Sequence, residues 1–172
     1  MKNIQTHLDN SSDKKYYEHI ISKLTDEQKE EFESLVIRLD NSGAKNPLQW
    51  ASSEVREKIP QFGRFLVLKS LFDIAKSTKD NISMADDFDE DFNEKYTEIE
   101  NILGQEKLSD FLKSYSKGII YSVIGLLDEG NINSDRDKIS WTLMKTDENF
   151  ETTGQIISGL HEDFLEFEDE IK

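Results

Sequence analysis

The chain has 172 residues, a net charge of −15 at neutral pH, 35% hydrophobic residues and no cysteine. This length suits one domain that buries a core without covalent staples, and the missing cysteines exclude disulfides, thiolate metal sites and a cysteine nucleophile. The negative charge opposes binding to nucleic acid or to anionic lipid.

The sequence predicts a cytoplasmic protein without a membrane anchor. Residues 1–10 lack the apolar segment of a signal peptide. The longest apolar stretch, residues 118–127, is interrupted by Tyr121 and Ser122 and is far shorter than the about 20 residues of a membrane span. We therefore expect this stretch to belong to a buried helix.

The charge is unevenly distributed along the chain. Residues 1–85 contain 13 acidic and 13 basic side chains, whereas residues 86–172 contain 23 acidic and 8 basic ones. The entire net charge thus belongs to the second half, which would attract a basic protein surface or cations. The alternative is that the charge serves solubility alone.

The first elements follow from apolar spacing and capping signals. Residues 1–11 are polar, and we expect them to be flexible. Apolar side chains then recur with the spacing of one helical face over residues 12–24. Thr25 begins a second helix as its N-cap, and Gln28 completes a capping box. The Asn-Ser-Gly segment at residues 41–43 ends this helix.

Two prolines delimit the next helix. Pro47 marks the first turn of a third helix, where its missing N–H costs no hydrogen bond, and Pro60 ends or kinks that helix. Residues 61–76 are apolar on most sides, which indicates a central fourth helix. We expect residues 76–85 to form a polar loop.

Two long amphipathic helices are predicted next, over residues 86–103 and 105–127, with Gly104 between them. The apolar side of the second consists of Leu108, Phe111, Leu112, Tyr115, Ile119, Val123 and Leu127, widened by Ile120 and Ile124. Glycines inside a helix cost about 1 kcal/mol each relative to alanine. We therefore expect another helix to approach closely at Gly118 and Gly125.

The pattern then changes to that of a β-hairpin over about residues 138–158. Ile139, Trp141 and Leu143 alternate along the chain as in a strand with one buried face. The polar segment 147–149 is typical of the connecting turn.

A last helix is predicted over residues 160–171, with Ser158 as its cap and one apolar face. The fold class is therefore α+β and predominantly α. We expect about seven helices in one compact domain, residues 12–172, with the hairpin near its C-terminus.

An acidic run in the second half has some features of a calcium-binding loop. Oxygen-bearing side chains occupy the ligand positions of such a loop. These are Asp87, Asp89, Asp91, Asn93 and Glu98. Phe92 stands where the sharp turn of the loop requires glycine, and Glu94 stands at a usually apolar position. The alternative, which the pattern favours, is an acidic helix start stabilised by the helix dipole.

The sequence gives little support for a zinc site, a phosphate-binding loop or a nucleophilic serine. His161, Glu162 and Glu166 share one helical face, but a helical zinc site requires a second histidine one turn on, at position 165, and that residue is Leu165. Glycine-rich phosphate loops and serine nucleophile motifs are missing from the sequence. We expect no catalytic residue and no cofactor, and the sequence favours a protein that is not an enzyme.

Arg64 lies inside the most apolar segment. It could be a buried charge partner or an anchor for an anionic ligand. The commoner arrangement, which we expect here, is an arginine that extends along the surface with its stem packed.

The C-terminal segment is the most distinctive part of the chain. Carboxylates there surround a narrow apolar stripe, and an aromatic residue precedes them on the predicted hairpin. The candidate partner-binding residues are Trp141, Glu162, Asp163, Glu166 and Asp169. Acidic fields steer basic partners, and aromatic residues anchor interfaces. The alternative is a solvated helix face with Trp141 in the core.

In general character, this small, acidic, cysteine-free chain resembles bacterial immunity proteins and small inhibitors. The likeness is one of composition, and no residue is carried over from it. The resulting hypothesis is a non-enzymatic binding module that neutralises a basic protein partner. The alternatives are a Ca²⁺- or Mg²⁺-dependent binding protein or enzyme that uses residues 86–98, and a structural or oligomer-assembly protein. The oligomeric state stays open.

Overall fold

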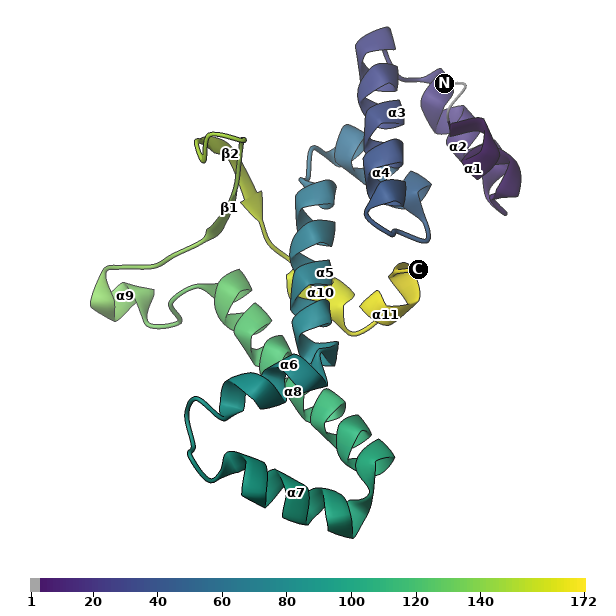
Figure 1. The fold of residues 1–172 in the computed structure, drawn as a ribbon. Helices are drawn as coiled ribbons and strands as arrows, with labels where there is room; N and C mark the ends of the chain where they lie inside the picture. Colours follow the sequence, from purple (N-terminus) through teal and green to yellow (C-terminus); the bar gives the residue numbers. More distant parts are fainter. Residues whose placement is uncertain (1–3) are drawn as a thin grey trace.

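A computed structural model describes residues 4–172 as a mainly helical protein with one two-stranded antiparallel sheet (Figure 1). The elements are α1 (Gln5–Asn10), α2 (Lys14–Ser22), α3 (Asp26–Asn41), α4 (Pro47–Glu57), α5 (Gln61–Lys76), α6 (Thr78–Ala85), α7 (Phe92–Leu103), α8 (Gln105–Glu129), α9 (Ser134–Asp137), β1 (Leu143–Thr146), β2 (Thr152–Ile157), α10 (Leu160–Phe164) and α11 (Phe167–Glu170). The α+β, predominantly α class is confirmed. The described residues contain 11 helices, where about seven were expected.

The start of α3 confirms the predicted capping box. The Gln28 backbone N–H donates to Thr25 Oγ1 at 3.2 Å, and the Thr25 N–H donates to Gln28 Oε1 at 3.0 Å. These two bonds satisfy backbone donors that lack partners inside the helix. Pro47 at the first position of α4 is likewise confirmed.

We expect Thr25→Ala to lower the free energy of unfolding by about 1 kcal/mol, because the Gln28 N–H loses its acceptor. Thr97→Ala is the matched control, since Thr97 lies inside α7 and its hydroxyl donates to the Asn93 carbonyl. That control should leave stability unchanged or slightly raised. Urea denaturation of both variants measures the difference, and equal losses would contradict the capping role.

The hydrophobic core surrounds α5, as predicted. Phe65 and Phe72 of α5 are buried, and both rings contact Phe167 of α11 at centroid distances of 5.4 and 5.9 Å. One cluster of buried side chains joins α1–α5 with α8, β2, α10 and α11, including Ile124 and Ile157. The last third of the chain therefore completes a core that the first half begins.

The C-terminus closes onto the loop between α3 and α4. The Lys45 N–H donates to the Glu170 carbonyl, and the Lys172 N–H donates to the Gly43 carbonyl, both at 2.8 Å. Ala44 and Ile171 form an isolated antiparallel bridge. The chain must be extended at Ile171 to make this bridge, so the predicted helix 160–171 ends early. It is also divided into α10 and α11, and its N-cap is Gly159, not Ser158.

Two helices after α5 were not predicted, and one predicted helix begins later than expected. Residues 78–85 form α6, a helix without apolar periodicity that buries none of its side chains. The helix predicted from residue 86 begins at Phe92, because the Asp89 carboxylate accepts the Asp91 N–H and holds a turn there. The polar residues 134–137 form the short helix α9.

The hairpin is present but shorter than predicted. Leu143 pairs with Ile157 and Thr146 with Thr152, and the Asp147 carboxylate accepts backbone N–H groups in the turn. Residues 138–142 stay outside the ladder, since they bond to the end of α8 and to the loop after it.

The N-terminal segment is helical where it is described. Leu8 of α1 and the preceding Ile4 are buried in the core cluster. Residues 1–3 lie outside the described part of the chain. The expected flexibility of residues 1–11 stays a prediction.

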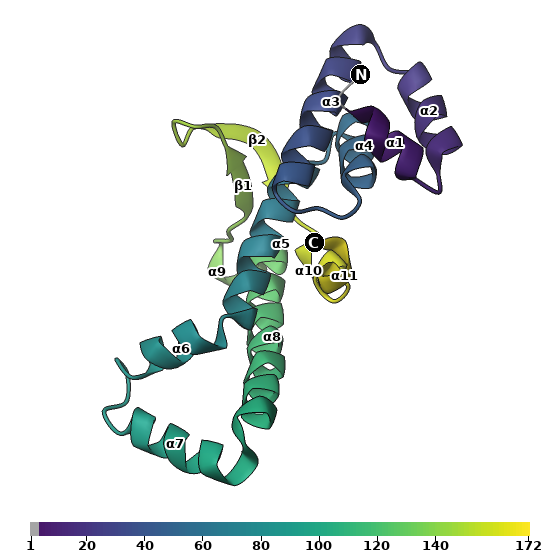
Figure 2. The same cartoon turned by 45° about the vertical axis from the view of Figure 1, so that its right-hand side comes forward.

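The part of the chain between α5 and the hairpin is much more open than the core. Side chains in α6 and α7 are all at least partly exposed. Figure 2 shows α6, α7 and α8 as three sides of a triangle that extends away from the core. Phe88, within the predicted amphipathic helix 86–103, is 91% exposed. This region therefore presents apolar side chains to its surroundings.

Candidate functional site

Arg64 anchors the acidic C-terminal segment to α5. Its side chain is 9% exposed. Nη2 donates to the Gly159 carbonyl and to Asp163 Oδ2, both at 2.7 Å, and Nη1 donates to Gln61 Oε1 at 3.0 Å. Arg64 is thus a buried charge partner, and the expected surface position was wrong. The carbonyl and carboxylate that converge on it compensate the cost of burying its charge.

Asp128, near the end of α8, supplies the missing cap of α10. Gly159 at the N-cap has no side chain to accept a backbone N–H. Asp128 Oδ2 instead accepts the N–H of His161 at 2.9 Å and lies 2.8 Å from Nδ1 of the same histidine. A carboxylate at a helix N-terminus also meets the positive end of the dipole. Asp128 therefore fixes the start of α10 against α8.

The ionisation of Asp163 is set by opposing effects. Burial raises the pKa of this carboxyl, the charge of Arg64 lowers it, and the carboxylates of Glu162, Glu170 and Asp128 raise it again. The net direction is upward. Asp163, one of the predicted partner-binding residues, is thus engaged within the protein and positions its neighbours.

Three other predicted residues are free to meet a partner. Glu162, Glu166 and Asp169 are exposed, and within residues 4–172 their carboxylates form no ion pair or hydrogen bond. Glu168 differs, because Lys117 and Lys76 bind it at 2.7 and 3.5 Å and lower its pKa. We call Glu162, Glu166 and Asp169 the acidic patch.

Trp141 lies apart from the acidic patch. Its indole N–H donates to the Leu126 carbonyl of α8 at 3.0 Å, and the residue is 48% exposed. In the described part of the chain, no hydrogen bond or ring contact joins Trp141 to the candidate carboxylates. Both ribbon views place α9 and α11 on opposite sides of α5 (Figures 1 and 2).

The candidate calcium ligands do not converge. Asp89 binds Lys95 through both carboxylate oxygens, at 2.9 and 2.7 Å, and the lysine lowers its pKa. Across residues 4–172, no three His, Asp or Glu side chains are arranged so that they could hold a metal ion.

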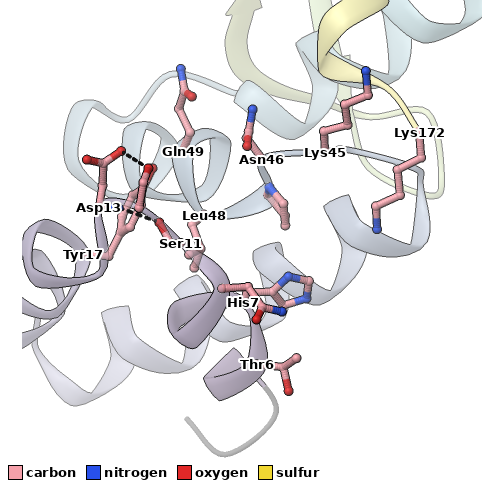
Figure 3. A pocket seen from close by; sticks show the side chains of 13 residues that line it. Thr6, His7, Ser11, Asp13, Tyr17, Lys45, Asn46, Leu48, Gln49 and Lys172 are labelled. Atoms are coloured by element: carbon pink, nitrogen blue, oxygen red, sulfur yellow. Dashed lines mark hydrogen bonds between the residues drawn. The ribbon is translucent and has the colours of Figure 1, made fainter.

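A polar cavity of about 730 Å³ lies between α1, α2 and the start of α4 (Figure 3). His7, Lys45, Lys172 and Asp13 contribute charged or ionisable groups to its walls. The two lysines are engaged elsewhere, Lys172 with Asp40 and Lys45 with the Glu168 carbonyl. The cavity therefore offers no unpaired lysine to a ligand.

No pattern in the sequence identifies Asp128 or Gly159 as parts of this site. Both act through contacts between residues far apart in the chain, which periodicity does not reveal. Arg64 was singled out by its apolar surroundings, and that signal pointed to the right residue.

Comparison with known protein families, curated proteins and solved structures finds no match for this chain. Within the described residues, the search for helices long and apolar enough to cross a membrane finds none.

Proposed function

We propose that this protein is a non-enzymatic binding module that recognises a basic protein partner through the acidic patch. The observation that carries the proposal is that Glu162, Glu166 and Asp169 are exposed and unpaired on a segment anchored to the core. Arg64, Asp128 and Phe167 hold that segment in place.

Anchoring matters because association costs conformational entropy. Carboxylates on an ordered segment lose less freedom on binding than those on a mobile tail. The excess acidic charge of residues 86–172 adds a long-range field that speeds encounter with a cationic surface. A basic enzyme or toxin whose active cleft is cationic is the class of partner that this chemistry suits.

We expect the triple variant Glu162→Lys/Glu166→Lys/Asp169→Lys to weaken partner binding by about tenfold or more, because attractive contacts become repulsive. The matched control is Asp86→Lys/Asp87→Lys/Glu90→Lys, which changes the net charge equally at exposed positions of the acidic run.

The measurement is a pull-down from the native cell lysate, with the wild-type protein and both triple variants as bait at low and high salt. Support for the proposal is a basic protein that the wild type and the control retain at low salt, and that the acidic-patch variant does not. Binding that is insensitive to salt, or lost equally in both triple variants, would sink the acidic patch as the binding surface.

A further inference from the structure

The long helix α8 has its apolar side turned away from the core. Ile124 is buried and Ile120 partly buried against the core cluster. Of the predicted stripe that these two residues border, Leu108 is buried, but Phe111 at 62%, Tyr115 at 61% and Ile119 at 48% are exposed. The expectation that the centre of this stripe faces the core was therefore wrong.

The exposed side of α8 also lacks charge. Between Leu108 and Leu127 the helix has three charged residues, Asp110, Lys113 and Lys117. The 3.6-residue period places all three on the side of Ile120 and Ile124, and Lys117 binds Glu168 of α11. A surface helix normally shows the reverse arrangement, with charges outward.

Two glycines leave space on the border of this stripe. A side chain built at Gly118 or at Gly125 would meet nothing within 4 Å. The close helix approach expected there does not occur within the described chain, although both glycines reduce helix stability. Their positions suit the approach of a helix from another molecule.

We propose that α8 is the contact surface of a homodimer, in which two copies pack their α8 helices antiparallel about a point between Gly118 and Ile119. In this register Tyr115 faces Ser122 of the second copy, and Ile119 faces Gly118. Leu112 faces Gly125, and Phe111 faces Leu126. The first three pairs set a large side chain against a small one, which is how packed layers interdigitate.

The lack of charged side chains on this surface favours a second copy of the chain as the molecule that covers it. A basic partner would be matched by carboxylates around the stripe, and none borders it between Leu108 and Leu127. Two molecules that each carry a net charge of −15 repel one another across most of their surfaces. They meet with least repulsion where both lack charge.

The exposed apolar area of α8 is a large part of what a dimer needs. The exposed parts of Phe111, Tyr115, Ile119, Val123 and Leu126 amount to about 500 Å² of mostly apolar surface, which is in the upper range of the largest, often functional, patch of a monomer. Exposed apolar residues continue beyond both ends of α8, in α7 and in the segment that includes Trp141. A standard interface buries about 800 Å² per partner, and the stripe on α8 alone would supply more than half of that area.

The first test is sedimentation equilibrium of the full chain from low micromolar to millimolar concentration. We expect a monomer–dimer equilibrium that strengthens as salt screens the negative charge. Ile119→Glu should raise the dimer Kd about 30-fold or more. Leu165→Glu, at an apolar residue that is 73% exposed elsewhere, should not change it.

Gly118→Leu separates packing from folding. The new side chain has open space in the monomer and a higher helix propensity than glycine, so the melting temperature of the monomer should not fall. In the dimer it would occupy the position of Ile119 from the second copy, and we expect Kd to rise about tenfold or more.

Cross-linking tests the register. Positions 115 and 122 are about 10 Å apart within one helix, too far for a disulfide, and the chain has no cysteine of its own. Tyr115→Cys/Ser122→Cys should therefore form a covalent dimer on oxidation. Asp110→Cys/Lys117→Cys, with the same spacing on the core-facing side, should not.

Three results would overturn the proposal. They are a monomer at every concentration, a dimer that Ile119→Glu leaves intact, and equal cross-linking of both cysteine pairs. A complex with a different protein that Ile119→Glu abolishes, while the purified chain stays monomeric, would also reject the second copy as the occupant. The dimer does not depend on the acidic patch, and its opposite response to salt distinguishes it from binding to a basic partner.

Discussion

Phe167→Ala should lower the free energy of unfolding by about 3–5 kcal/mol, the largest effect expected from any single change considered for this chain. Phe167 is fully buried, and its ring contacts Phe65 and Phe72 of α5. Truncation removes the burial of an aromatic ring and leaves a cavity between α5 and α11. Because α11 buries no other side chain, the whole C-terminal segment should loosen.

The measurement is guanidinium denaturation of Phe167→Ala beside Leu165→Ala. Leu165 lies two residues away and is 73% exposed, so its variant should lose little stability. Phe167→Leu, which restores part of the volume, should recover part of the loss. A Phe167→Ala variant as stable as Leu165→Ala would mean that the C-terminal segment does not contribute to the core.

Sequence patterns correctly predicted α3, α4 and α5 in the first half of the chain, where capping signals and buried apolar faces indicate the same helix. The Thr25 capping box, Pro47 at the start of α4 and the apolar α5 each combine a short-range signal with a buried face. One apolar face was predicted along the last helix, and Leu160, Phe164 and Phe167 are buried there, although that helix is divided and ends early. The three helices of the first half hold because burial supports the same helices that the sequence favours.

Apolar periodicity gave a wrong prediction of burial for α8, whose apolar face is not covered by the core. The stripe on α8 was interpreted as core-facing, since an apolar face and a buried face have the same pattern in sequence. Ile120 and Ile124, considered its margin, are the residues that contact the core. The positions of α5 and α10, with which α8 packs most extensively, determine which side of α8 faces the core. An apolar stripe therefore predicts a contact but not the molecule that supplies it.

The sequence identified the acidic residues of the candidate site, but it did not show which of them contact one another in the fold. Five C-terminal and hairpin residues were proposed together, and the structure separates them by role. Asp163 binds Arg64, Trp141 bonds to α8, and the remaining carboxylates stay free. Salt bridges between residues 99 positions apart, as between Arg64 and Asp163, leave no periodic trace in the sequence.

Arg64→Met should lower the free energy of unfolding at neutral pH by about 2–4 kcal/mol. The substitution keeps much of the apolar stem but leaves Asp163 and the Gly159 carbonyl without their donor. Removing one partner of a buried pair costs more than removing both. Arg64→Met/Asp163→Leu should therefore be more stable than Arg64→Met alone, and urea denaturation of both variants and of Asp163→Leu gives the coupling between the two sites.

The stability lost in Arg64→Met should also depend on pH, and the ionisation of Asp163 determines whether it rises or falls with pH. Arg64 lowers the pKa of this carboxyl against the effect of burial, so the pKa rises further when Arg64 is removed. An acid whose pKa is raised on folding stabilises the folded state below its unfolded pKa, and that contribution is lost as pH rises through the folded value. The difference between wild type and Arg64→Met should thus be smallest near pH 4, about the ordinary pKa of an aspartate, and grow toward neutral pH. Arg56→Met, at an exposed arginine bonded to the Tyr16 hydroxyl, should show no such trend. A difference that stays constant with pH would mean that Arg64 acts through packing and not through the charge of Asp163.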